Sequence, residues 1–87
     1  MITTNDPQSS LLGKILLDVR GLMPPAPMQR ALEALAILPP RAILVVHTWR
    51  EPHVLHEIID VDGWSRTGRQ LAPGHWETCI WRQEDAG

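Results

Sequence analysis

Thiol, imidazole and carboxylate side chains are the groups of this chain that could do chemistry, and the thiol comes first. The chain has a single cysteine, Cys79, which excludes a disulfide within the chain and a four-cysteine zinc site. Cys79 lies in an apolar and aromatic stretch, where a free cysteine is typically a small packed residue. Glu77, two residues away, disfavours the thiolate form. We therefore expect a packed cysteine and keep a sulfur relay through Cys79 as an alternative.

Histidines form the second group. His53 and His56 are three residues apart, and His47 precedes them closely. Residues three apart on a helix share a face, and imidazoles are common ligands of zinc and iron. The other interpretation is a set of ordinary surface histidines, with His53 and His56 paired to Glu57 and Asp60 four residues on. We expect no cofactor and keep a metal or haem-iron site at His47, His53 and His56 as an alternative.

Asp18 is the best single carboxylate, but its surroundings in the sequence do not suggest a base. The sequence has no hydrolytic constellation and no glycine-rich phosphate loop. We expect Asp18 to pair with Arg20 or Arg50, or to cap backbone N–H groups.

Composition limits the classes of partner. The 87 residues suffice for one domain and carry a net charge of −2 with scattered basic residues, so nucleic acid is not expected as a partner. No apolar run approaches the ~20 residues that span a bilayer, so no membrane is expected either. The polar N-terminus has no signal-peptide pattern. We expect a cytoplasmic domain over residues 14–82, with a flexible leader at 1–13 and a tail at 83–87.

The elements that position these residues follow from apolar patterning. Residues 14–20 and 42–48 are apolar runs typical of strands. Residues 25–38 carry an apolar stripe at spacings of three and four, which predicts a helix that two prolines then end. Residues 52–61 predict a second helix, closed by Gly63. Its inward face is expected to consist of Val54, Leu55, Ile58 and Ile59.

A hairpin completes the fold. Strands are predicted at residues 64–71 and 75–82, joined by the turn residues Ala72-Pro73-Gly74. The order βαβαββ predicts an α/β fold of the α+β two-layer sandwich type. It has a four-stranded mixed sheet with two helices on one face.

One face of such a sheet carries no helices. Alternation along the last predicted strand places Trp76 and Ile80 on one face and Cys79 and Trp81 on the other. An aromatic side chain is therefore expected on the uncovered face, which invites pairing of two copies as a homodimer.

The stretch that opens the first predicted helix carries a family resemblance. Residues 17–28 read LDVRGLMPPAPM. They resemble the TusA/SirA signature, in which an Asp and a Gly-Leu precede a Cys-Pro-x-Pro that opens a helix. The matching positions are Asp18, Gly21, Leu22, Pro25 and Pro27, and the family's cysteine position is Pro24.

A second resemblance extends over most of the chain. The sequence is similar to a TusA-like "domain of unknown function" group often linked to hemerythrin-like and cupin domains. The similarity rests on the Leu-Asp-x-Arg-Gly-Leu opening, the Arg-Glu-Pro-His segment at 50–53 and Trp76, and it covers residues 16–82. It implies a TusA-like two-layer sandwich with a four-stranded mixed sheet.

The replacement of the family's cysteine changes the expected chemistry. At a helix N-terminus, the dipole and the free N–H groups stabilise a thiolate. Pro24 has neither a thiol nor an N–H, and Pro25 and Pro27 remove two more donors. We therefore expect no sulfur transfer at this position and poor binding of anions.

Tryptophan is the remaining signal, because the chain has four tryptophans and no tyrosine or phenylalanine. Trp49 follows the second predicted strand, at the sheet end where the proline-rich loop lies. It either closes the end of the core with Leu22 or forms an apolar patch with that loop, and Trp and Arg are enriched at binding hot spots. We predict a non-enzymatic binding or regulatory module for an unknown protein partner. Its binding residues are expected to be Asp18, Arg20, Met23, Pro24, Trp49, Arg50 and His53.

Overall fold

All six predicted elements are present in the computed structural model, which describes residues 13–83. In chain order they are β1 (Lys14–Asp18), α2 (Ala26–Ala36), β2 (Ile43–Thr48), α3 (His53–Val61), β3 (Trp64–Ala72) and β4 (His75–Arg82). The predicted βαβαββ order and α+β class are confirmed. Residues 1–12 and 84–87, which hold most of the predicted leader and tail, lie outside the described residues.

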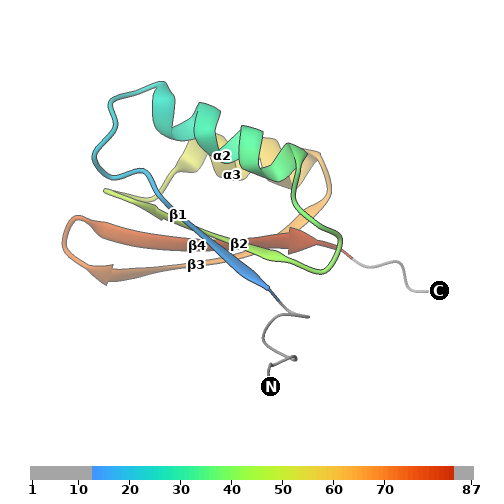
Figure 1. Ribbon diagram of the computed structural model, residues 1–87. Coiled ribbons are helices and arrows are strands. Elements are labelled where there is room, and N and C mark those ends of the chain that lie inside the picture. The colour runs from blue at the N-terminus through green and yellow to red at the C-terminus, as the bar shows by residue number, and fades with distance from the viewer. Residues whose placement is uncertain (1–12, 84–87) are drawn as a thin grey trace, which may run out of the picture.

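The strands form one mixed sheet in the order β1-β2-β4-β3. β1 pairs parallel to β2, and the other two pairings are antiparallel. Both helices lie on the same face of this sheet, and no helix of residues 13–83 lies on the other face, which we call the uncovered face (Figure 1). The parallel pairing brings the carboxyl ends of β1 and β2 to the same edge of the sheet, so the loops that lead into α2 and α3 start there.

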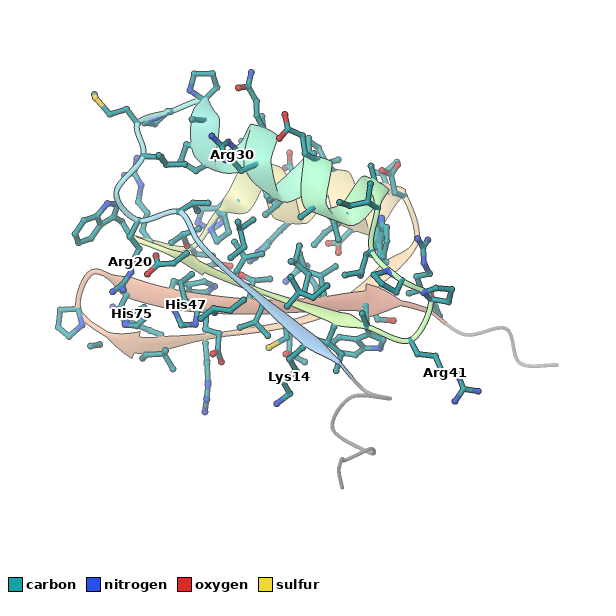
Figure 2. All side chains as sticks on the ribbon, in the orientation of Figure 1. Lys14, Arg20, Arg30, Arg41, His47 and His75 are labelled. Atoms are coloured by element: carbon teal, nitrogen blue, oxygen red, sulfur yellow. The ribbon has the colours of Figure 1, made fainter. Side chains whose placement is uncertain are left out.

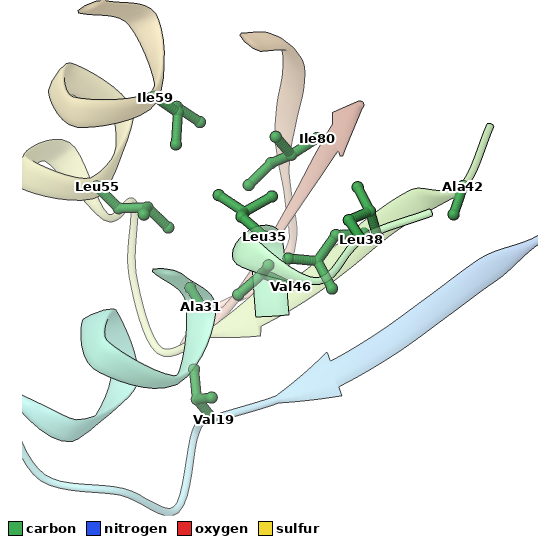
Figure 3. Packing of buried hydrophobic residues seen from close by; sticks show 10 residues of the cluster. Val19, Ala31, Leu35, Leu38, Ala42, Val46, Leu55, Ile59 and Ile80 are labelled. Carbon is green, nitrogen blue, oxygen red and sulfur yellow. The ribbon is translucent and has the colours of Figure 1, made fainter. Parts of the chain in front are cut away.

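The core lies between the helices and the sheet. Leu44 and Val46 of β2 and Ile80 of β4 are fully buried, and they pack with residues of both helices (Figure 3). The helix residues in this cluster are Ala31, Leu35, Leu55 and Ile59. Side chains at spacings of three and four supply the helix contacts, while alternate residues supply the strand contacts.

The inward face predicted for α3 needs two corrections. Leu55 and Ile59 are buried, but Val54 is 58% exposed. His56, expected at the surface, is only 4% exposed and lies on the side of α3 that faces the sheet. The first turn of α3 thus presents a polar side chain to the interior, where Thr78 of β4 satisfies it.

Two predicted boundaries also move by two residues, and the others move by one residue at most. β1 ends at Asp18 instead of Arg20, because the Arg20 N–H turns back to Asp18 Oδ1 (3.1 Å) and the Leu22 N–H bonds the Val19 carbonyl (3.1 Å). α2 ends at Ala36 instead of Leu38. The Leu38 N–H bonds the Leu35 carbonyl (3.2 Å), three residues back, which tightens the last turn.

The uncovered face consists of rows that run across the four strands. Register places Leu16, Val45, Cys79 and Thr67 in one such row. The neighbouring row consists of Asp18, His47, Glu77 and Arg69. A largely apolar row therefore lies directly beside a row of charged and titratable side chains.

Candidate functional site

A broad, open groove lies at the sheet end where the loops into α2 and α3 meet. Its volume is about 1120 Å³. The first loop contributes Leu22, Pro24 and Pro25, and the second contributes the segment 49–52. The first turns of both helices and the strand-end residues Val19, Val46 and Thr48 complete the lining. Most of these side chains are apolar, and Arg50, Glu51 and His53 are the charged or titratable members.

Backbone hydrogen bonds hold both loops in place. The Val19 N–H bonds the His47 carbonyl (3.0 Å) and so fixes the end of β1 against β2. The Ala26 N–H bonds the Met23 carbonyl (2.9 Å), which closes the turn into α2. In the second loop, the Thr48 hydroxyl donates to the Arg50 carbonyl at 2.6 Å.

The helix start beside the groove offers few donors. α2 begins after Pro25 and has no side-chain cap. Pro24, Pro25 and Pro27 have no N–H, and the Ala26 N–H is already bonded to Met23. A helix terminus with so few free N–H groups is a weak site for an anion.

Trp49 is the largest exposed apolar side chain at the groove. It is 60% exposed, so the interpretation in which Trp49 and Leu22 close the end of the core is wrong. One edge of its indole lies against the β3–β4 turn, since a Cβ added at Gly74 would stand 3.4 Å from Trp49 Cε3. Gly74 has a φ of 74°, which suits glycine in this turn.

The predicted binding residues divide between different surfaces. Pro24, Trp49, Arg50 and His53 line the groove. Met23 is 80% exposed but does not line it. Because β1 and β2 pair in parallel, the two loops start at the same end of the sheet and bring the four lining residues together, as expected from the strand order.

Asp18 and Arg20 belong to the uncovered face of the sheet instead. Arg20 holds the Asp18 carboxylate with both Nε (2.9 Å) and Nη2 (2.8 Å), so the predicted Asp18–Arg20 pair is confirmed and a pair with Arg50 is not. Hydrogen bonds from the Arg20 side chain and backbone N–H hold the pKa of Asp18 far below its usual range. Asp18 faces away from the groove because it shares its sheet face with His47.

A chain of polar contacts on that face was missed by sequence reasoning. His47 Nε2 lies 3.2 Å from Glu77 Oε2, and His47 Nδ1 lies 3.0 Å from His75 Nε2. Arg69 Nε donates to the other oxygen of Glu77 at 3.2 Å. Arg20, His47 and His75 gather at one end of the sheet (Figure 2). The β2–β4 register brings His47 to Glu77, and the β3–β4 register brings Arg69 to Glu77.

Two groups in this chain of contacts have altered pKa values. Burial lowers the pKa of His75, and the positive charges of Arg20 and His47 add to the effect. Burial alone would raise the pKa of Glu77, but hydrogen bonds from His47 and Arg69 outweigh it and the pKa is lowered.

The three histidines of the alternative metal or haem-iron site do not converge. His47 lies on the uncovered face, His56 is buried on the helix side, and His53 is 77% exposed at the groove. Among residues 13–83, no three His, Cys, Asp or Glu side chains are grouped so that they could hold a metal ion. The predicted pairs with Glu57 and Asp60 are also wrong, because both His53 and His56 approach Glu51 instead (3.8 and 3.5 Å).

Cys79 lies on the uncovered face beside Val45, half-buried and unpaired with another cysteine. Trp81 lies on the same face, as predicted for an aromatic of β4.

In the part of the chain that the structure describes, no helix combines the length and apolarity needed to cross a membrane.

Comparison with known proteins identifies a family. The family model described as "Uncharacterized conserved protein (DUF2249)" matches residues 16–82, and the chain therefore belongs to this family. The match runs from β1 to the last residue of β4 and includes both groove loops. No curated protein and no solved structure matches the chain.

Proposed function

We propose that this member of the DUF2249 family is a non-enzymatic, cytoplasmic protein-binding module whose docking site is the groove between the α2 and α3 loops. The observation that carries the proposal is the exposed indole of Trp49, in a groove that Arg50 and the apolar loop residues Leu22 and Pro24 also line. Tryptophan and arginine in a preformed pocket are the residue types that contribute most to protein interfaces.

Charge at the rim suggests the chemistry of the partner. The Glu51 carboxylate lies 3.8 Å from His53 Nε2 and 3.5 Å from His56 Nδ1. The Arg50 guanidinium has no hydrogen-bond or ion-pair partner among residues 13–83. A partner segment that inserts apolar side chains and brings a carboxylate to Arg50 would complement both features.

The groove lining favours binding over catalysis. It contains no thiol, and its one histidine, His53, is largely exposed. The Thr48 hydroxyl donates to a backbone carbonyl and is not a free nucleophile. On the resemblance to TusA-like carriers, Pro24 stands where a carrier cysteine would stand, so we interpret the groove as a docking surface on a carrier-type scaffold.

The test compares partner capture by single-residue variants of the full chain. Proteins retained by the wild type from a lysate of its own host are identified, and their affinities are then measured with purified partner. We expect Trp49→Ala and Arg50→Ala each to weaken binding about tenfold or more. Ile37→Ala is the matched control, because Ile37 is an exposed apolar residue that does not line the groove. Equal binding by all four proteins would rule out the groove as the docking site.

A homodimer through the uncovered face stays a prediction. Trp81 and the exposed Leu16 favour it, while the neighbouring row of charged side chains limits the apolar area. Native mass spectrometry of untagged protein distinguishes one chain from two.

A further inference from the structure

The imidazoles of His47 and His75 form a close pair on the uncovered face, away from the groove. His47 Nδ1 and His75 Nε2 are 3.0 Å apart, and the ring centroids are 4.6 Å apart with the planes at 66°. The two residues belong to β2 and β4, which are neighbouring strands of the sheet. The sheet therefore holds one ring nitrogen of each histidine directly beside the other.

Glu77 orients the pair. An ionised carboxylate only accepts hydrogen bonds, so the His47 nitrogen that faces it, Nε2, carries the hydrogen. The other nitrogen of His47, Nδ1, then presents its lone pair to His75. Arg69 fixes the second oxygen of Glu77. A histidine that donates one ring N–H to a carboxylate and directs the other nitrogen outward is the usual arrangement of a metal-bound histidine.

The spacing of the two nitrogens also suits a cation. Two imidazole nitrogens bound to a tetrahedral metal at ~2.0–2.1 Å stand about 3.3 Å apart. The present separation of 3.0 Å is close to that value. Binding would require a small outward shift and the transfer of the His75 hydrogen to its other ring nitrogen, with no change in net proton count.

We infer that His47 and His75 bind a first-row divalent transition-metal ion, with Glu77 as the orienting carboxylate. The cation class follows from the imidazole ligands, which suit Cu²⁺, Ni²⁺ and Zn²⁺, with Cu²⁺ bound most tightly. Since no third ligand converges among residues 13–83, water or a group from another molecule completes the coordination. This site is separate from the docking groove and does not depend on the proposed function.

Titration of the untagged, metal-stripped full chain with Cu²⁺ tests the site. We expect one equivalent to bind. The imidazole NMR signals of His47 and His75 should broaden before those of His53 and His56. The copper electron paramagnetic resonance spectrum should show two coordinated nitrogens. The assignment would be overturned if Cu²⁺ binding did not saturate near one equivalent, or if the imidazole signal of His53 broadened first.

Variants separate ligand from orienting residue. His75→Gln should weaken Cu²⁺ binding at least tenfold, and Glu77→Gln should weaken it about 10–100-fold without removing a ligand. His53→Gln is the control, because His53 is exposed at the groove and should leave the affinity unchanged. His47→Gln, which removes the other ligand, is expected to weaken binding in the same way as His75→Gln. Circular dichroism checks that each variant folds. If His47→Gln does not fold, the result with His75→Gln alone tests the proposal. Unchanged affinity in His75→Gln, or an equal loss in His53→Gln, contradicts the proposal.

Discussion

Nε2 of the buried His56 lies 3.2 Å from Oγ1 of Thr78 and links α3 to β4 inside the domain. The same hydroxyl accepts a hydrogen bond from Trp76 Nε1 at 3.2 Å. Both His56 and Thr78 are buried, so each needs a partner to offset the loss of water. This polar group between helix and sheet occupies a place where the apolar pattern alone predicts hydrophobic contact.

The burial of His56 predicts a pH-dependent stability. Burial, followed by the charge of Arg66, lowers the pKa of His56 below its ordinary value of 6.5. The unfolded chain therefore binds more protons than the folded one between the lowered pKa and pH 6.5. The free energy of unfolding should be level above this window and should decrease as the pH falls through it.

Urea unfolding between pH 5.5 and 7.5, a range that spans the ordinary histidine pKa of about 6.5, measures this effect. Because His75 shifts in the same direction, the wild type is compared with His56→Gln, which cannot titrate but can still hydrogen-bond Thr78. The free energy of unfolding should change less with pH in the variant than in the wild type. An identical slope would show that His56 is not responsible.

Gly68 should resist substitution by alanine. A Cβ at Gly68 would stand 3.1 Å from Trp76 Nε1 and 3.2 Å from Trp76 Cζ2, so the indole would have to shift. We expect Gly68→Ala to lower the free energy of unfolding by about 1–3 kcal/mol and to move the Trp76 indole N–H signal. Gly21→Ala is the control, since a Cβ there meets no atom within 4 Å. Equal stability of the two variants would contradict the predicted clash.

Arg82 secures the end of β4. Its Nη2 donates to the Leu38 carbonyl at 2.9 Å, and its guanidinium lies 4.8 Å from the centroid of the Trp64 ring. Arg82→Ala should lower the free energy of unfolding by about 1–2 kcal/mol. Arg82→Lys should lower the free energy of unfolding by less, because lysine keeps the positive charge. Some loss remains, because lysine cannot stack on the Trp64 ring as the planar guanidinium does. Denaturant titrations measure both, and a wild-type midpoint for Arg82→Ala would show that neither contact stabilises the fold.

Cys79 tests the sulfur-relay alternative. Cys79 is half-buried, and Val45 and Thr67 are its partners on the two neighbouring strands. We expect iodoacetamide at neutral pH to modify Cys79 much more slowly in the folded protein than in urea, as followed by intact mass. Rapid modification of the folded chain would favour a relay role for this cysteine.

The sequence by itself determined the six elements, their order and the α+β class. Apolar spacing on residues 25–38 and alternation in β4 report which side of each element is buried, and Pro39 and Gly63 mark helix ends. These are local signals, because hydrophobic periodicity reflects the geometry of a single helix or strand. The pairing of Asp18 with Arg20 was accessible for the same reason, since the two are close in sequence.

Only the tertiary structure decided which side chains meet across elements. The β2–β4 register brings His47 to Glu77, which is 30 residues away in the chain, and to His75, which is 28 residues away. The same register turned Asp18 away from the groove, while the rotation of α3 exposed Val54 and buried His56. Strand register and helix rotation result from how all the elements pack at once, and no single stretch of sequence encodes them.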